Sequence, residues 1–324
     1  MRFERNSLFA ILAAACLFPL LVSDQYILHL AIMVLFYAVL ATSLNLIVGY
    51  VGEFSLGHTA FLGIGAYAAA LLSLHLGLPI YLTIPLAGLI AAVFGYLIGL
   101  VTLKLEGPYF VIVTLAFAEV LRLIANNWIG FTNGPMGLAG VSQPAILANA
   151  TPLATKQVYY AVGLLVASVA LYLAYRFVHS NAGRAAVAVR ESRYVAQSIG
   201  VSPFGAAMLA FILSAGLAGL AGGFYAHYIS FVGPDVFQFA FMASMIIMVL
   251  MGGKGTLLGP LAGALIVTLL EEYLREVQLL RLTIFGLIVM AVVLFLPRGL
   301  LGSLARRRET YSGATSTRPA GGAA

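Results

Sequence analysis

The stretch GYVGEFSLGHTAFLGIGAY, residues 49–67, decides how the fold of this chain is interpreted. It places a Glu, a Ser, a His and a Thr among five glycines, and long apolar runs flank it on both sides. Inside a lipid bilayer, non-helical backbone is tolerated only where protein or a water-filled cavity surrounds it. In a membrane protein, the stretch therefore predicts a break between two helices rather than an ordinary surface loop.

The composition indicates a membrane protein. The chain has 324 residues, of which 62% are hydrophobic and only 9% are charged, and its mean hydropathy is +1.04. Soluble domains carry about a quarter charged residues, so this chain cannot cover a water-facing surface. We therefore predict an all-α, polytopic membrane helical bundle in the lipid bilayer. The single cysteine, Cys16, excludes an intrachain disulfide.

Ten apolar segments approach the length of about 20 residues that a helix needs to cross the hydrocarbon core. The first begins after a basic start, like a signal peptide, and its LAAAC string resembles a lipoprotein processing site. Because the apolar run continues past Cys16 to Val22, we interpret it as a retained first span. The predicted spans are 7–22, 26–48, 58–76, 81–103, 108–128, 158–177, 206–230, 238–253, 256–273 and 281–297.

The distribution of positive charge supports the count of ten, which places both termini in the cytoplasm. Cytoplasmic loops are enriched in Lys and Arg, and removing or adding one span would scatter these residues to both sides. The net charge of +6 thus indicates membrane orientation rather than a nucleic-acid partner. The cytoplasmic set is Arg2, Arg5, Lys104, Arg176, Arg184, Arg190, Arg193, Lys254, Arg298, Arg306, Arg307, Arg308 and Arg318, against Lys156, Arg275 and Arg281 outside.

Two regions are expected to lie beyond the spans on the cytoplasmic side. Residues 1–297 form the predicted transmembrane domain, and the small, polar tail 298–324 is expected to be disordered. The connection 179–204 is too long for a turn, carries a cluster of Arg, and has Val187, Val195 and Ile199 at helical spacing. We predict one or two short amphipathic helices there.

A second string resembles the opening stretch. SFVGPDVF (230–237) shares a V-G-acidic core with GYVGEFSL, so that Glu53 corresponds to Asp235. The two strings fall on opposite faces of the membrane, and the spans around them, 2–5 and 7–10, form two sets of four with opposite polarity. This pattern predicts an inverted repeat.

Small residues at four-residue spacing predict close helix packing, because they let backbones approach. The three ridges are Ser55–Thr59–Gly63, Ala215–Gly219–Gly223 and Gly255–Gly259–Gly263.

Polar residues within or beside the spans are candidates for a substrate path or gate. Glu119 and Arg122 stand three apart on a predicted helix and can pair, either as a structural ion pair or on the path. Glu53 and His58 are interpreted as loop or gate residues, and Asn45 as a residue that bonds across helices. The candidate set is Asn45, Glu53, Ser55, His58, Thr114, Glu119 and Arg122.

Catalytic and cofactor motifs are absent from the sequence. GGKGT (252–256) lacks the spacing and the G-K-[ST] order of a phosphate-binding loop, so it predicts no ATP site. The chain has no H-E-x-x-H, C-x-x-C or G-x-S-x-G string, and no His pair at metal-ligand spacing. We therefore predict neither an enzyme nor a bound metal or cofactor.

Five blocks occur in one order along the chain: SLGHTAFLGIGAYAAALL (55–72), GPYFVIVTLAFAEVLRLIANN (107–127), GRAAVAVRESRYVAQSIGV (183–201), FILSAGLAGLAGGFYAHY (211–228) and GGKGTLLGPLAGALIV (252–267). Together they resemble the LivM-type permeases of branched-chain amino-acid ABC importers, over roughly residues 26–297. Urea permeases and some aromatic-acid permeases share these blocks. The substrate therefore stays open between branched-chain amino acids and urea or another small amide or organic acid.

The resemblance implies a subunit of the cytoplasmic (inner) membrane that pairs with a related second permease. Two cytoplasmic ATPases would bind the ATP, and a periplasmic or extracellular binding protein would deliver the substrate. Segment 179–204 would dock on an ATPase as a coupling segment. The residues that match the family pattern there are Gly183, Arg184, Arg190, Glu191, Ala196 and Gly200.

Two alternatives come from other classes of protein. An ion-coupled secondary transporter can also carry inverted repeats and an acid like Glu119, but it has no need of the basic segment 179–204. A membrane-embedded enzyme should show clustered His, Asp or Cys facing one cavity, and the sequence shows no such cluster.

Overall fold

The computed structural model describes residues 15–19, 22, 24–144, 151–274, 286–287, 290 and 299. Most of the predicted first span (7–22), the tenth span (281–297) and the polar tail (298–324) lie outside these residues.

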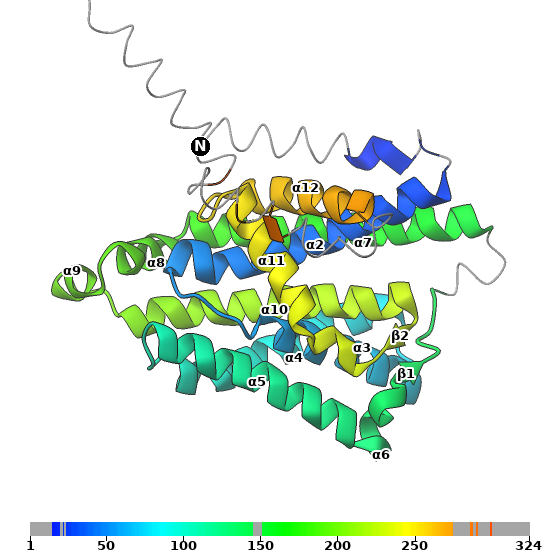
Figure 1. Cartoon of the computed structure of the whole chain (residues 1–324), viewed down its shortest axis with the longest axis horizontal. Helices are drawn as coiled ribbons and strands as arrows, with labels where there is room; N and C mark the ends of the chain where they lie inside the picture. The colour runs from blue at the N-terminus through cyan, green and yellow to red at the C-terminus, as the bar shows by residue number, and fades with distance from the viewer. Residues whose placement is uncertain are drawn as a thin grey trace, which may run out of the picture.

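The described residues form a bundle of helices with one small antiparallel ladder (Figure 1). The helices are α2 (Gln25–Asn45), the π-helix η1 (Leu46–Val51), α3 (His58–Leu76), α4 (Ile80–Thr102), α5 (Pro108–Asn127), α6 (Ile129–Thr132), η2 (Gly134–Met136), α7 (Pro152–Val178), α8 (Asn181–Glu191), α9 (Arg193–Ser198), α10 (Pro203–Ile229), η4 (Pro234–Phe237), α11 (Phe239–Gly252) and α12 (Gly259–Tyr273). The strands are β1 (Leu138–Ala139) and β2 (Phe231–Val232).

Among the described residues, six helices are long and apolar enough to cross a membrane. This confirms the prediction of an all-α polytopic membrane protein. The helices α11 and α12 coincide with the predicted spans 238–253 and 256–273 but have only 14 and 15 residues. The count of ten spans stays a prediction. The six are Gln25–Val51, His58–Leu76, Ile80–Thr102, Pro108–Asn127, Pro152–Val178 and Pro203–Ile229.

The opening stretch is a helix break. The regular α-helix α2 ends at Asn45, η1 continues to Val51, and Gly52 takes a left-handed conformation with φ 88°. The backbone then runs without helical structure until α3 begins at His58. A side chain at Gly52 would also collide with Arg190 of α8, so glycine is required there for both conformation and space.

The second break lies where the resembling string predicted it. Helix α10 ends at Ile229, and β2 pairs antiparallel with β1 in the register Leu138↔Val232. The chain then turns back through η4, where the ring of Phe237 packs against Gly63 and stacks on Tyr67 with centroids 5.9 Å apart. Gly63 precedes the end of α3 at Leu76 by about 20 Å of helix, so η4 reaches deep into the bundle.

The two breaks belong to opposite ends of the bundle (Figure 1). Gly52 contacts α8, which lies at one end with α9, whereas β2 pairs with β1 at the other end. We refer to these as the α8–α9 end and the β1–β2 end. This placement agrees with the predicted opposite faces of the two strings.

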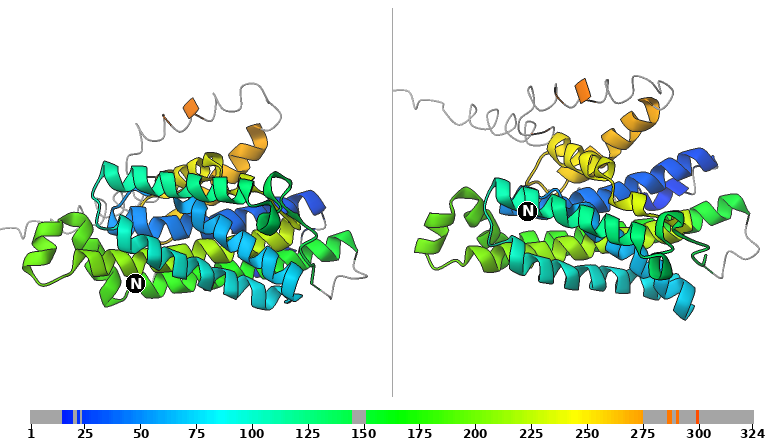
Figure 2. Two further views of the ribbon diagram at one scale, coloured as in Figure 1. Left: turned by 90° about the horizontal axis from the view of Figure 1, so that it is seen from below. Right: turned by 60° about the horizontal axis from the view of Figure 1, so that its bottom comes forward.

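Helix α10 lies in the centre and packs along α3 and α4, while α2 packs on α7, α12 and α11. The contacts are made by small residues, as the ridges predicted. Gly219 meets Gly65 of α3 and Ala91 of α4, and Gly263 meets the backbone of Met248. Ser55 and Gly255, the first members of two ridges, lie outside the helices. Helix α5 runs along the edge of the bundle (Figures 1 and 2).

The closest backbone approach gives a prediction for stability. A side chain at Gly65 would collide with the backbone of Gly219, so we expect Gly65→Ala to lower the free energy of unfolding by about 1–3 kcal/mol. Thermal unfolding in detergent measures the effect. Gly130→Ala is the matched control, because no described atom lies within 4 Å of a side chain built there. Equal melting temperatures for both variants would contradict the packing.

Candidate functional site at the α8–α9 end of the bundle

Serine residues cap the N-termini of α8, α9 and α10. Ser180 accepts a hydrogen bond from the amide of Gly183 at 3.2 Å and starts α8, and Ser192 accepts one from Val195 at 3.4 Å and starts α9. Ser202 caps α10 in the same way. Side-chain oxygens at this position satisfy helix amides that have no partner within the helix. The predicted amphipathic segment 179–204 is thus two short helices, which confirms that prediction.

The inner face of the segment fixes it to the bundle. Gly183 lies against the carbonyls of Phe177 and Val178 at the end of α7, where a side chain would not fit. Ala196 is also buried, whereas Gly200 turns the chain outward with φ 83°. Within the described part of the chain, the side chain of Arg184 bonds to residues of its own segment, the carbonyl of His179 and the amide oxygen of Asn181.

The outer face of α9 is apolar and open to solvent in this chain. Tyr194, Val195 and Ile199 are 84%, 62% and 69% exposed. Helix α9 lies at the end of the bundle (Figure 1). Large apolar side chains grouped on an exposed surface are typical of interaction sites.

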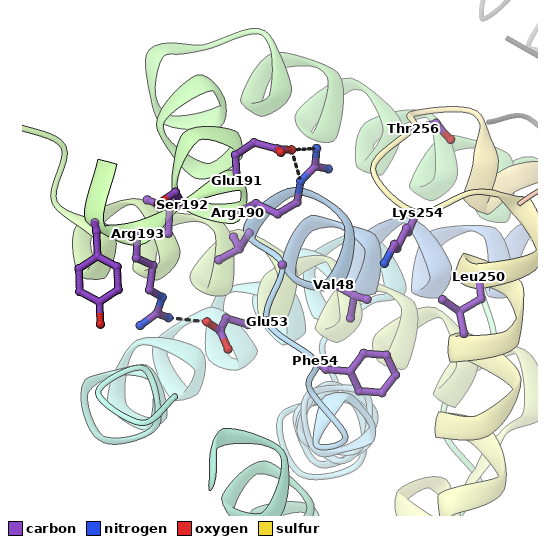
Figure 3. Close-up of a pocket in the computed structure, with 14 residues that line it drawn as sticks. Val48, Glu53, Phe54, Arg190, Glu191, Ser192, Arg193, Leu250, Lys254 and Thr256 are labelled. Carbon is purple, nitrogen blue, oxygen red and sulfur yellow. Dashed lines mark hydrogen bonds and ion pairs between the residues drawn. The ribbon is translucent and has the colours of Figure 1, made fainter. Parts of the chain in front are cut away.

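Behind α8 and α9 lies a recess of about 800 Å³ between these helices, the first break and the loop from α11 to α12 (Figure 3). Figure 3 shows Arg190 and Arg193 reaching in from one side, and Lys254, Leu250 and Phe54 lying across from them. The lining residues are Val48, Val51, Gly52, Glu53, Phe54, Val189, Arg190, Glu191, Ser192, Arg193, Tyr194, Leu250, Lys254 and Thr256.

Arg190 caps the end of the broken helix. Its Nη1 donates to the carbonyl of Gly49 in η1 at 2.7 Å, and its Nη2 pairs with Glu191 at 2.7 Å. A cation at a helix C-terminus satisfies carbonyls that have no partner in the helix and interacts favourably with the helix dipole. Arg190, predicted as a coupling residue, thus contacts the break, and Glu191, predicted as another, pairs with Arg190.

Arg193 links three elements through two carboxylates. It forms an ion pair with Glu53 in the first break and a second one, of 2.6 Å, with Glu106 in the loop from α4 to α5. The Glu53 side chain is only 13% exposed, so this pair is better shielded from solvent than a surface salt bridge. Arg193 was not predicted as a site residue, although it lies in the Arg-rich segment 179–204.

Asn45 ties the same break to the loop from α11 to α12. Its Nδ2 donates to the carbonyl of Thr256 at 2.9 Å, and its Oδ1 accepts from the amide of Gly255 at 2.8 Å. The backbones of η1 and this loop approach each other closely. A side chain at Gly49 would collide with the amide of Gly255, and a side chain at Gly255 would crowd the carbonyl of Gly49. Asn45 was expected to bond across helices; its partners here lie in a loop, and its place on a substrate path stays a prediction.

Ser55, His58 and Thr114 are buried and hold the break from inside. The amide of Leu56 donates to Thr114 Oγ1 at 3.2 Å, and Ser55 Oγ accepts from Gly57. His58 Nε2 lies 2.7 Å from Ser43 Oγ. These contacts fix the start of α3 against α5 and α2, and the three side chains lie in the packed interior rather than in the recess.

Glu119 and Arg122 lie elsewhere, on α5. They pair as predicted, with Arg122 Nη2 2.6 Å from Glu119 Oε1. Their side chains are 52% and 35% exposed in this chain, so the pair is not buried within the subunit. The predicted path residues therefore divide between the α8–α9 end and the outer face of α5. Within the described part of the chain, His, Cys, Asp and Glu form no group of three that could hold a metal.

The double ion pair of Arg193 generates a prediction. We expect Arg193→Ala to free the backbone of residues 52–57 and to raise the hydrogen-exchange rate of their amides by about tenfold, while α3 and α10 stay protected. Hydrogen exchange read by mass spectrometry measures this. Arg184→Ala is the control, because its partners lie within its own segment. Unchanged exchange at 52–57 would show that Arg193 does not hold the break.

Comparison with known proteins identifies the family. The family described as branched-chain amino acid transport system / permease component matches residues 26–296. The chain is 31% identical over 319 residues to the high-affinity branched-chain amino acid transport system permease protein LivM of Salmonella typhimurium, covering 92% of this chain and 75% of that protein.

Two further relatives are more distant. The LivH permease protein of the same transport system in Salmonella typhimurium is 23% identical over 290 residues, covering 82% of this chain and 91% of LivH. The autoinducer 2 import system permease protein LsrC of Salmonella paratyphi B is 28% identical over 221 residues, covering 64% of this chain and 60% of LsrC. No solved structure matches the chain. This chain belongs to the family of permease components of branched-chain amino acid transport systems, which are transport subunits and not enzymes.

Proposed function

We propose that the chain is one of two membrane subunits of an ABC importer that moves leucine, isoleucine and valine across the cytoplasmic membrane. The family and the name of its LivM relative support this substrate class. The observation that carries the role in an ABC importer is the exposed apolar surface of α9, formed by Tyr194, Val195 and Ile199 at the basic end of a membrane bundle.

The α8–α9 end faces the cytoplasm in this proposal. Lys and Arg residues concentrate there, which the positive-inside rule associates with the cytoplasmic side. Gly299 lies against Gly253, so the chain is back at this end after α12, in agreement with an even number of spans and a cytoplasmic C-terminus. The described residues of this basic end are Lys104, Arg176, Arg184, Arg190, Arg193 and Lys254, against Lys156 at the other end.

Segment 179–204 then couples the permease to a cytoplasmic ATPase that binds the ATP. The apolar surface of α9 enters a groove on the ATPase, while Gly183 and Ala196 hold the segment to the bundle. Gly200 provides the turn out of α9, and Arg184 and Glu191 lie on the exposed side. Two such ATPases serve the two permease subunits.

Movement reaches the membrane region through the contacts behind α8 and α9. Arg193 joins the segment to Glu53, Arg190 joins it to Gly49, and Asn45 continues the connection to the loop before α12. A displacement of the segment is thus transmitted to the first break and to α11–α12 as rigid bodies. Rocking of packed helices in this way exposes one side of a transport path at a time.

The packing of helices supports an inverted repeat. After each break, the helix pair that follows packs on the other repeat: α3 and α4 pack on α10, and α11 and α12 pack on α2. Helices α2 and α10, which precede the breaks, contact each other near the centre. Exchanging the two repeats thus reproduces the same set of contacts, as expected for a pseudo-two-fold axis in the membrane plane.

In this proposal the second permease lies opposite the exposed face of α5, so that this face lines the space between the two subunits rather than lipid. This helix crosses the membrane region with Glu119 and Arg122 exposed, and charged side chains do not face lipid at that depth. The similarity to LivH supports a related second subunit. A periplasmic or extracellular binding protein delivers the substrate at the β1–β2 end. The alternative substrate is a different small solute. Urea is one such solute, and autoinducer 2, which appears in the name of the relative LsrC, is another.

The coupling surface is testable by truncation. We expect the double variant Tyr194→Ala, Ile199→Ala to lower ATP-dependent uptake at least about tenfold, since central aromatic and aliphatic contacts dominate binding at interfaces. Uptake is measured in proteoliposomes that contain the assembled importer. Tyr81→Ala is the control, because Tyr81 is equally exposed but lies at the start of α4, near the β1–β2 end. Normal uptake by the double variant would refute docking through α9.

The energy source and the substrate are tested together. Leucine uptake by the complete importer should stop when the partner ATPase carries an inactivating substitution and should persist when a protonophore removes the ion gradient. Mass spectrometry of the solute held by the co-purified binding protein identifies the substrate. Uptake that follows the ion gradient would refute the ABC mechanism, and a bound solute other than a branched-chain amino acid would refute the substrate assignment.

A further inference from the structure

The second break exposes polar groups at membrane depth. Asp235 and Gln238 belong to η4 and its end, and both are exposed in this chain, as is Phe239 at the start of α11. The depth follows from Phe237, which packs against Gly63 about 20 Å from the end of α3. Non-helical backbone at such a depth must be covered by protein or line a water-filled cavity.

The ion pair on α5 lies beside this break. Glu119 stands about 16 Å along α5 from its start at Pro108, near the middle of the membrane region. Helix α5 packs against η4, and Asp235 is close enough to Arg122 to act on it electrostatically. Two carboxylates and one guanidinium therefore gather on one exposed surface between α5 and η4.

A buried hydroxyl without a partner lies at the same place. Tyr67 of α3 is 6% exposed, its ring stacks on Phe237, and Asp235 also acts on it electrostatically. Among the described residues, the hydroxyl of Tyr67 has no hydrogen-bond partner. A buried polar atom left unsatisfied costs about 1–3 kcal/mol, so a polar group that reached this hydroxyl from the surface beside η4 would be stabilised there.

We infer that Arg122, Glu119 and Asp235 form a site for the charged head group of a zwitterionic amino acid on the transport path. This inference rests on the proposed function and names the residues that would recognise its substrate. The α-carboxylate binds the guanidinium of Arg122, and the α-ammonium lies between Asp235 and Glu119. Phe239, which is 56% exposed, offers an apolar surface for the side chain of the substrate.

The geometry of the pair suits a transient site. Arg122 holds Glu119 through Nε at 2.9 Å and Nη2 at 2.6 Å, the bidentate arrangement that a substrate carboxylate would adopt. The substrate carboxylate thus replaces Glu119 on Arg122, and the released Glu119 becomes a partner for the ammonium. The contact of the substrate carboxylate with Arg122 is made at the expense of the existing Arg122–Glu119 pair, which lowers the net affinity. A transport path requires such low affinity, because the substrate must also leave.

Gln238 lies at the edge of the site, next to Asp235. Its side-chain amide donates a hydrogen bond to Asp235 Oδ1, which leaves the second carboxylate oxygen available. Because Gln238 is exposed and lies next to the charged groups without being one of them, it is a suitable position for a reporter cysteine. Cys16, the single native cysteine, is replaced by serine in the same chain.

The test measures water access and substrate protection. The complete importer carrying Cys16→Ser, Gln238→Cys is placed in proteoliposomes and treated with a membrane-impermeant cationic thiol reagent. We expect the cysteine to react, and leucine to slow the reaction severalfold. 4-Methylpentanoate, which lacks the ammonium, and isoamylamine, which lacks the carboxylate, should have little effect. Val120→Cys is the matched control, because Val120 is exposed at the same depth on the flank of α5 away from Arg122.

Two further variants test the assigned roles. Asp235→Asn and Arg122→Lys should each remove the protection by leucine while size-exclusion profiles stay unchanged. An unreactive Gln238→Cys, absence of protection, or equal protection by the two single-charge analogues would overturn the site. Leucine uptake by the importer without any reporter cysteine is measured in parallel. If that uptake is ATP-dependent and protection is absent, only the site fails, whereas absent leucine uptake refutes the proposed function itself.

Discussion

Backbone groups at the two helix breaks must find partners inside the membrane region, and the rest of the structure depends on how they do so. At the first break, Thr114 accepts from the amide of Leu56, and Arg190 donates to the carbonyl of Gly49. At the second, β1 pairs with β2 before the chain turns back into the bundle. In lipid, backbone groups left without partners would each cost several kcal/mol, so these contacts make the breaks possible.

The contacts of the first break also join it to segment 179–204 and to the loop before α12. The residues that satisfy or hold the first break come from α5, α8, α9 and the loop before α12, so a displacement of segment 179–204 acts on the break directly. The second break is instead held by α3 and α5, through Phe237 and its neighbours. Both breaks thus contact α5, but only the first is also joined to α8 and α9 by the contacts described above. A displacement of α8 and α9 would therefore move the first break relative to the second without unfolding either break.

The sequence predicted the parts of this structure that depend on local pattern. Composition indicated the membrane bundle, glycines beside charge indicated both breaks, and the spacing of apolar residues indicated α8 and α9. The i,i+3 pair of Glu119 and Arg122 was also predictable, because it depends only on helix geometry.

Contacts between distant residues could not be predicted. The ion pair of Arg193 with Glu53 joins residues 140 positions apart, and nothing local distinguishes Arg193 from the neighbouring Arg190. The depth of η4 depends on a void at Gly63 that only the assembled bundle creates for Phe237. For the same reason, the resemblance between the two strings relates Asp235 to Glu53 but does not place Asp235 beside Arg122. The exposure of the α5 pair depends on which helices pack on α5, which composition does not determine.

The central claim is that the coupling segment and the first break move as one body against the second break. Spin labels at residues 194 and 54 report the distance between segment 179–204 and the first break. Labels at residues 54 and 239 report the distance between the two breaks. The native side chains at all three positions are exposed. Pulsed electron paramagnetic resonance measures both distances in the assembled importer, with and without a trapped ATP analogue. We expect the 194–54 distance to stay constant while the 54–239 distance changes. A change in the 194–54 distance with a constant 54–239 distance would contradict the account.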